Sequence, residues 1–194
     1  EQTNWLRSLP ELRVAYETDR YPYSFVDQQG EFSGISADYL RLLNERLGLK
    51  FKLIPAKDWS ALKELVINHQ VDLVAAGSAN DFSTNDMLFS QPYETFPGVI
   101  VTRVGGPAIA GPSDLSRRVV AIREEQSMVS RAKTLLGGST LVPVGSNESG
   151  LAMVASGKAD AYIGTLPAID SLIRNRYAAQ LRVIGPAGID LDLA

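Results

Sequence analysis

The sequence contains no cysteine and a single histidine, His69. The lack of cysteine excludes disulfide bonds, thiolate metal sites and cysteine nucleophiles. One histidine, placed in a polar turn, leaves little material for a histidine-based zinc site or a Ser-His-Asp triad. We therefore expect no metal, no cofactor and no enzymatic activity in this chain.

Basic clusters are also scarce. Lysine and arginine total 19, against 22 aspartates and glutamates in 194 residues, and the only basic cluster is Arg117-Arg118. This balance argues against nucleic acid as a partner. No apolar run approaches the length that a membrane-spanning helix needs.

Short apolar strands alternate with helical patterns, which predicts an α/β fold with largely parallel sheets. A hairpin turning at 27–30 follows the first strand. One helix is expected to begin at Ser36 and end at Gly48, and another to begin at Asp58 or Ser60. Further helices are expected near 127–136, 148–155 and 166–177. The expected strands cover 12–16, 51–54, 71–76, 99–104, 118–122, 140–144, 159–164 and 181–185.

A helix–turn–strand unit occurs twice, at 60–77 and at 149–164, each time with an aspartate before an apolar run that ends in glycine. A Gly/Pro-rich stretch from 105 to 112 separates the two copies and indicates a boundary or hinge. We therefore expect two α/β lobes, although two similar steps within one larger sheet would give the same pattern. The predicted limits are lobe 1 at 1–98, a crossing strand or hinge at 99–104, lobe 2 at 105–186, and the start of a return strand at 187–194.

The segment YPYSFVDQQGEFSGISADYLRLLNERLG resembles the opening signature of family 3 extracellular solute-binding proteins, with Pro22-Tyr23 before a hairpin and Gly34 four residues before Asp38. Four more segments match the family in the same order: DW at 58–59, VDLVAAG at 71–77, LFSQPYE at 88–94 and SGKADAYIG at 156–164. The resemblance implies a type II periplasmic-binding-protein (Venus flytrap) fold, whose two lobes close on a small molecule. The family normally returns to lobe 1 through further elements, so IDLDLA at 189–194 is expected to be the beginning of a truncated return segment.

The segment DYLRLLNERLGLKFKLIPAKDWSALKEL is similar to the flytrap domains of bacterial sensor histidine kinases of the BvgS and EvgS type. This similarity implies a periplasmic sensor domain that signals by lobe closure, is tethered to the membrane by segments outside this chain, and forms a homodimer in the full-length protein. The alternatives are a free solute-binding protein of an ABC transporter for amino acids or related small polar solutes, and a dehydratase-type enzyme on the same fold. A LysR-type effector domain shares the fold class, but the opening signature argues against it.

The resemblance also predicts what the site has lost. Amino-acid-binding members use an arginine for the α-carboxylate and an aspartate for the α-ammonium, and these positions correspond to Ser83 and Thr165 here. Because a buried charge without a partner is costly, an ordinary α-amino acid is not the expected ligand. A carboxylate or an aromatic acid is expected instead, or no ligand at all. Thr165 is equally well explained as the cap of the following helix.

The remaining candidates are residues that the resemblance places near the cleft. Each has a structural alternative: a core position for the aromatic residues, a helix cap for the serine at 127, and solvation for the arginines. Glu17 is a further acid expected behind the site. The predicted ligand-binding residues, besides Ser83 and Thr165, are Arg20, Tyr23, Trp59, Ser78, Arg123 and Ser127.

Overall fold

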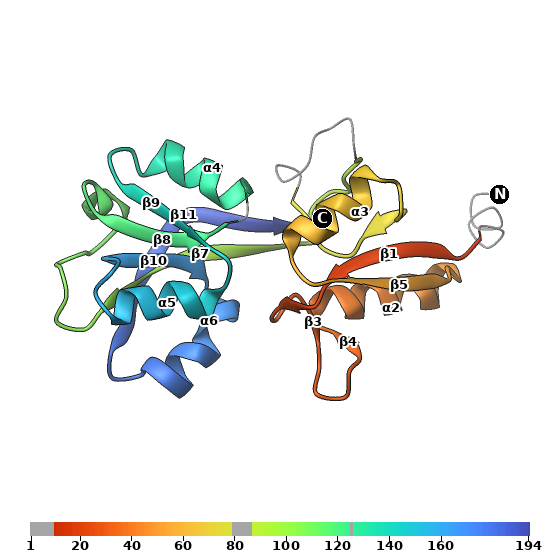
Figure 1. Cartoon of the computed structure of the whole chain (residues 1–194), viewed down its shortest axis with the longest axis horizontal. Coiled ribbons are helices and arrows are strands. Elements are labelled where there is room, and N and C mark those ends of the chain that lie inside the picture. The colour runs from red at the N-terminus through yellow and green to blue at the C-terminus, as the bar shows by residue number, and fades with distance from the viewer. Residues whose placement is uncertain (1–9, 79–86, 125) are drawn as a thin grey trace. The chain divides into compact units, whose positions relative to one another are not determined.

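The computed structural model describes residues 10–78, 87–124 and 126–194, and it divides into two compact units (Figure 1). Unit 1 comprises Glu1–Gly77 and Phe82–Phe89, and unit 2 comprises Ser78–Asp81 and Ser90–Ala194. Each unit has its own sheet flanked by helices, which confirms the α/β class. The lobe limits expected from the sequence stay a prediction.

Unit 1 is built on a three-stranded parallel sheet in the order β5-β1-β6. Its strands are β1 (Leu12–Glu17), β5 (Phe51–Ala56) and β6 (Leu73–Val74), and its helices are α2 (Ile35–Leu47) and α3 (Trp59–Ile67). The helices lie on opposite faces of the sheet (Figure 1). The strand β6 is shorter than the strand predicted at 71–76, because only Leu73 and Val74 pair with β1.

Alternate residues of β1 build the two halves of this core, as the period of a strand requires. Val14 and Tyr16 pack with Leu40 of α2, whereas Ala15 packs with Leu62 of α3. The apolar run of β1 is thus explained by burial on both faces.

The expected hairpin is present, with strands β2 (Asp19–Arg20), β3 (Ser24–Val26) and β4 (Phe32–Ser33) in one small antiparallel sheet. Asp27 organises the turn, since its Oδ1 accepts hydrogen bonds from the N–H groups of Gln29 and Glu31, both at 2.9 Å. The hydrogen bonds from Glu31 and from the Ser33 hydroxyl lower the pKa of Asp27.

The helix α2 begins at Ile35 rather than at a Ser36 cap, so that prediction is wrong. The first helical N–H groups bond to the hairpin instead: Ile35 donates to the Pro22 carbonyl at 3.2 Å, and Ser36 donates to the Tyr23 carbonyl at 2.9 Å. Gly34 permits this approach, because it has φ +109° and an added Cβ would lie 2.7 Å from both carbonyl oxygens. The structure thereby explains why the opening signature pairs Pro22-Tyr23 with Gly34.

Two other helix limits agree with the sequence. The helix α2 ends at Gly48, which is left-handed with φ 69° and donates to the Asn44 carbonyl. The helix α3 uses Asp58 as its N-cap, because Asp58 Oδ1 accepts the Ala61 N–H at 2.8 Å.

Unit 2 has a five-stranded mixed sheet in the order β11-β7-β10-β8-β9. The strands are β7 (Glu94–Arg103), β8 (Val119–Arg123), β9 (Thr140–Val144), β10 (Ala161–Thr165) and β11 (Leu181–Leu193). The helices are α4 (Gln126–Leu135), α5 (Asn147–Ala155) and α6 (Leu166–Leu172), with a 3₁₀ turn at Pro112–Leu115 and a π-helical turn at Ile173–Tyr177. The helix α4 covers one face of the sheet, and α5 and α6 cover the other (Figure 1).

Strands β8, β9 and β10 are parallel, whereas β7 and β11 form an antiparallel pair at one side of the sheet. The sequence predicted two short segments at 181–185 and 187–194, but the structure has one thirteen-residue strand, β11, with register shifts after Val183 and after Pro186. Its partner β7 begins at Glu94, five residues before the expected start. None of the helices described in the structure is long and apolar enough to cross a membrane.

Candidate functional site

The candidate residues of unit 1 gather at the carboxyl ends of β1 and β6, the edge where open α/β sheets bind ligands. The two strands are adjacent, with Ala15 opposite Val74. Glu17 is the last residue of β1, and Ala76 lies two residues beyond β6. Arg20 and Tyr23, from the hairpin, complete this group.

Arg20 and Glu17 form a buried ion pair. The Arg20 Nη1 atom lies 3.5 Å from Glu17 Oε2, and the two side chains are only 4% and 7% exposed. The same nitrogen donates to the Ala76 carbonyl at 3.4 Å, which joins the hairpin to the end of β6. A buried ion pair repays its desolvation only when its geometry is good, and loss of one partner is strongly destabilising. These two contacts of Arg20 lie within unit 1, and its role toward a ligand stays a prediction.

Tyr23 is also buried, and the Arg20 guanidinium carbon lies 5.7 Å from the centre of its ring, within the range of a cation–π contact. The neighbouring Ser24 donates from Oγ to the Glu17 carbonyl at 2.7 Å. Because Ser24 fixes the hairpin on β1, it also fixes the position of Tyr23. The sequence analysis did not single out Ser24 or Ala76, since both contacts depend on how distant segments lie together.

Trp59 and Ser78 are both buried in the structure. Trp59 packs in one core cluster with Ala15, Leu62 and Val66, which corresponds to the core alternative for this aromatic residue. Ligand contact by Trp59 or Ser78 stays a prediction.

In unit 2 the candidates lie at the carboxyl ends of the parallel strands. Arg123 ends β8 and Thr165 ends β10, and the two strands are neighbours with Ile122 opposite Ile163. Ser127 belongs to the first turn of α4, which follows β8 after a short loop. The structure therefore places Arg123, Ser127 and Thr165 at one end of the same sheet.

Arg123 repeats a feature of Arg20, because it too donates to a main-chain carbonyl beyond the end of a nearby strand. Its Nη1 donates to the Gly145 carbonyl, just after β9, at 2.5 Å. The side chain is partly buried. Arg20 thus links the hairpin to the end of β6, and Arg123 links the ends of the neighbouring strands β8 and β9.

Thr165 is the N-cap residue of α6, but its side chain makes no capping hydrogen bond. The residue is 4% exposed. The prediction that Thr165 occupies the cap position is confirmed, although its hydroxyl makes no capping hydrogen bond. Ser83, the other position of the amino-acid recognition pair, lies outside the described residues.

The described residues also lack any cluster of three or more histidine, cysteine, aspartate and glutamate side chains that could hold a metal ion. Glu17 is the only buried carboxylate within 10–78, 87–124 and 126–194. The described candidate side chains at the two strand-end groups are thus arginines, hydroxyls, aromatic rings and the ion-paired carboxylate of Glu17.

The two α/β units, each with a central sheet flanked by helices, correspond to the Venus flytrap class of fold. Residues 12–137 match the bacterial extracellular solute-binding proteins, family 3. The chain belongs to this family, and it is an extracytoplasmic domain.

Several known proteins are similar to the chain over most of its length. The virulence sensor protein BvgS of Bordetella pertussis is 26% identical over 182 residues, which are 94% of this chain and 15% of BvgS. A crystal structure of the BvgS VFT2 domain, a double mutant, has 26% identity and a TM-score of 0.86, and the match covers 100% of this chain and 82% of that domain. A probable amino-acid ABC transporter-binding protein of Haemophilus influenzae is 26% identical over 173 residues, covering 89% of this chain and 66% of that protein. The chain therefore spans only about a sixth of the length of the BvgS sensors.

Proposed function

We propose that the chain is the extracytoplasmic ligand-sensing domain of a membrane-bound sensor histidine kinase. The observation that carries the proposal is the match to the BvgS VFT2 domain along the whole chain. The kinase activity and the membrane tether would lie in other parts of the protein, and the full-length protein would be a homodimer.

The sensing mechanism is closure of the two lobes on a small molecule. A ligand that contacts both lobes favours the closed state by its differential affinity for that state. The proposed contacts are the residues predicted from the sequence: Arg20, Tyr23, Trp59, Ser78, Ser83, Arg123, Ser127 and Thr165.

The proposed ligand class is a carboxylate or aromatic acid rather than an α-amino acid. Thr165 supports this choice, because a buried hydroxyl at the end of β10 cannot neutralise an ammonium group as a carboxylate would. Ser83 corresponds in the sequence to the arginine that binds the α-carboxylate in amino-acid-binding members, so that arginine is missing here.

We also propose that the domain is not catalytic. Proton transfer needs an acid or base whose protonation state is free to change during the reaction. Glu17, the buried carboxylate of the described residues, is ion-paired with Arg20. This pairing suits a structural role for Glu17 and argues against a dehydratase-type reaction.

A free transport-binding protein is the second candidate, and the similarity to the Haemophilus influenzae protein favours it. The two candidates are separated by replacing the VFT2 domain of BvgS with this chain and measuring kinase autophosphorylation in membranes. If the chain is a sensor domain, the hybrid protein should keep regulated kinase activity. The same replacement with the Haemophilus influenzae protein is the control. Kinase activity that is lost with both domains would favour the transport function.

Ligand class is tested separately by the melting temperature of the chain with amino acids, dicarboxylates, aromatic acids and polyamines. A ligand at a hundredfold excess over its Kd adds about 2.7 kcal/mol of stability, a shift of several degrees. The double variant Ser83→Arg/Thr165→Asp should gain a shift with an α-amino acid that the unchanged chain lacks. A shift of the unchanged chain with α-amino acids would overturn the proposed ligand class.

A further inference from the structure

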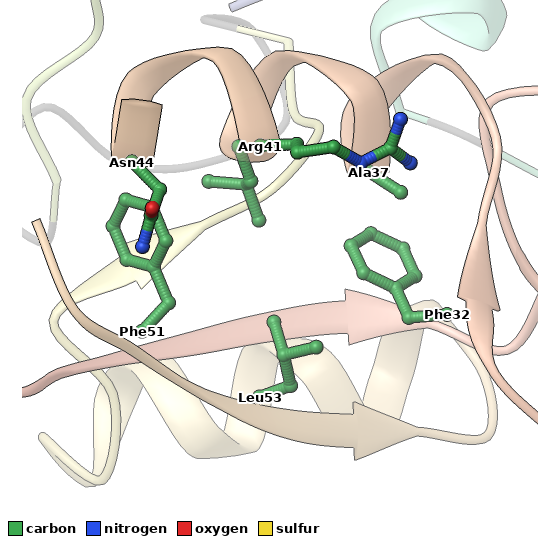
Figure 2. Close-up of a pocket in the computed structure, with 7 residues that line it drawn as sticks. Phe32, Ala37, Arg41, Asn44, Phe51 and Leu53 are labelled. Carbon is green, nitrogen blue, oxygen red and sulfur yellow. The ribbon is translucent and has the colours of Figure 1, made fainter. Parts of the chain in front are cut away.

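Unit 1 has an open hollow of about 270 Å³ between α2 and β5 (Figure 2). The hollow lies at the amino-terminal half of β5, whereas the candidate ligand residues of unit 1 lie at the carboxyl ends of the strands. Its apolar walls come from Phe32 and Leu40 together with Phe51 and Leu53, and its polar walls come from Arg41 and Asn44.

The strand β5 forms one edge of the sheet, because among the described strands it pairs only with β1. Lys50 and Ala56 both use their carbonyls in this ladder, accepting from the N–H groups of Leu12 and Thr18. In a parallel ladder alternate residues bond to the same neighbour, so the N–H and C=O groups of Phe51 and Leu53 point away from β1. A row of such outward groups is a template for another strand.

The side chains beside this edge are arranged to receive an apolar group. Phe51 and Leu53 point into the hollow from β5, while Asn44 lies above Phe51, and Arg41 extends along α2 toward Phe32 (Figure 2). Leu53 is 43% exposed, although it is apolar and lies in a strand. The hollow is therefore an apolar recess directly beside outward-pointing main-chain groups.

Basic side chains lie along the edge strand, in a chain whose net charge is −3. Lys50 and Lys52 are exposed on and beside β5. Neither lines the hollow, and the alternation of the strand turns Lys52 to the face opposite Phe51 and Leu53, so both lysines would meet the outward side chains of an added strand. Arg41 is 66% exposed and is paired at 3.0 Å with Asp38, which is 69% exposed. An exposed ion pair of this kind contributes little stability, so Arg41 can exchange Asp38 for a carboxylate of a bound molecule.

We propose that β5 and the hollow dock an extended, acidic segment of a partner protein, which pairs with β5 as an additional strand. The segment places one large apolar side chain between Phe51 and Leu53 and a carboxylate beside Arg41. Such strand addition draws affinity from main-chain hydrogen bonds and specificity from the side-chain recess. Pro55 has no N–H group to donate, so the paired stretch is limited to about three residues of β5.

The experiment uses the 194-residue chain and fluorescein-labelled hexapeptides in which glutamates flank a core of valine and leucine. One comparison peptide carries lysine in place of glutamate, and another carries an N-methyl group on the leucine, which removes a ladder hydrogen bond. Binding is measured by fluorescence anisotropy, and amide exchange of the chain is followed by NMR. Arg41→Glu is compared with Arg46→Glu, which makes the same charge change on α2 but does not line the hollow.

The acidic peptide should bind about tenfold tighter than either comparison peptide, and Arg41→Glu should weaken it about tenfold, while Arg46→Glu changes it less than about twofold. Exchange of the Phe51 and Leu53 amides should slow on binding. Equal binding of the N-methylated peptide would overturn strand addition and favour an amphipathic small molecule as the occupant. Failure of every peptide to bind, or blockage of this edge by a second copy of the chain, would also overturn the proposal.

Discussion

Asp160 holds the beginning of β8 through two hydrogen bonds with Val119. Its carboxylate accepts the Val119 N–H at 2.9 Å, and its own N–H donates to the Val119 carbonyl at 2.8 Å. In unit 1 Asp72 makes the same two main-chain bonds with Arg13 of β1, both at 2.8 Å. The aspartate has the same function in both copies of the helix–turn–strand unit. It joins the residues just before one strand (β6 or β10) to the beginning of the neighbouring strand (β1 or β8).

Removal of this carboxylate from unit 2 should weaken the fold. We expect Asp160→Ala to lower the free energy of unfolding by about 1–2 kcal/mol, because the partly buried Val119 N–H loses its acceptor. Urea denaturation followed by circular dichroism measures the change. Asp19→Ala, at an exposed position of the hairpin, serves as the control and should change stability by less than about 0.5 kcal/mol. Equal effects of the two variants would show that the Asp160 bond is not special.

The pair of Asp72 and Arg13 should make stability depend on acid pH. Hydrogen bonds from the Arg13 side chain lower the pKa of Asp72 from 3.8 to about 2. Because the folded-state pKa is depressed, this stabilisation is complete above pH 4 and is lost as the pH falls through 2. Both side chains are more than a third exposed, so screening reduces the contribution to about 1 kcal/mol. The stability difference between the unchanged chain and Asp72→Asn should therefore shrink between pH 4 and pH 2, and a constant difference would contradict the assignment.

Gly150 of α5 provides room for a buried tyrosine ring. A Cβ added at Gly150 would lie 2.3 Å from Cε2 of Tyr162, which is fully buried. The Tyr162 hydroxyl also donates to Asn147 Oδ1 at 2.5 Å, so the ring cannot shift without losing this bond. We expect Gly150→Ala to destabilise the chain by about 1–3 kcal/mol.

A double variant tests the cause of the Gly150 effect. If the ring clash is responsible, Gly150→Ala combined with Tyr162→Ala should cost less than the sum of the two single changes. Gly137→Ala is the matched control, because no atom lies within 4 Å of a Cβ added there. Additive costs, measured by thermal denaturation, would contradict the clash.

Arg20→Leu should destabilise unit 1 by about 3–5 kcal/mol, because Glu17 would remain buried without its charged partner. Replacing both residues, Arg20→Leu with Glu17→Gln, should restore part of that loss, since the uncompensated charge is gone. Denaturation in guanidinium chloride compares the three chains. A double variant that is no more stable than Arg20→Leu would show that the ion pair is not the source of the effect.

The helix α4 is fastened to β11 by Arg131, which donates to the Asp190 carbonyl at 2.7 Å and to the Asp192 carboxylate at 3.2 Å. We expect Arg131→Gln to speed amide hydrogen exchange at the end of β11, because the strand loses its side-chain tie to the helix. Arg174→Gln is the control, since Arg174 of the π-helical turn forms an exposed ion pair with Asp170, four residues earlier in α6. Unchanged exchange near Asp192 in Arg131→Gln would contradict this role.

Local patterns predicted most elements of the fold, because hydrophobic periodicity and end signals act within a few residues. Gly48 and Asp58 are two such signals, and the structure confirms both. The start of α2 was predicted wrongly at Ser36, because the groups that cap this helix are carbonyls of a hairpin thirteen residues earlier. The single long strand β11 was missed for a similar reason, since its continuity comes from pairing with β7.

The strand ends that carry candidate residues were predictable, whereas the contacts of those residues were not. The strand ends carrying Thr165 and Arg123 follow from the alternation of strands and helices. The ion pair of Arg20 with Glu17 could not be predicted, because it depends on a hairpin folding back over β1. Likewise the bond from Arg123 to Gly145 requires β8 and β9 to be neighbours, which no local pattern specifies.

The antiparallel pair of β7 and β11 has a mechanical consequence. A pulling force applied along β11 would act in shear on its hydrogen bonds with β7, so that many of these bonds would oppose separation at the same time. The ladder has two irregularities: a bulge at Ile184, and a wider interruption where Ala187, Gly188 and Ile189 stand opposite Gly98 alone. Under tension the wider interruption should yield first, so that the segment from Asp190 to Leu193 separates from β7 while the segment from Leu181 to Pro186 stays paired.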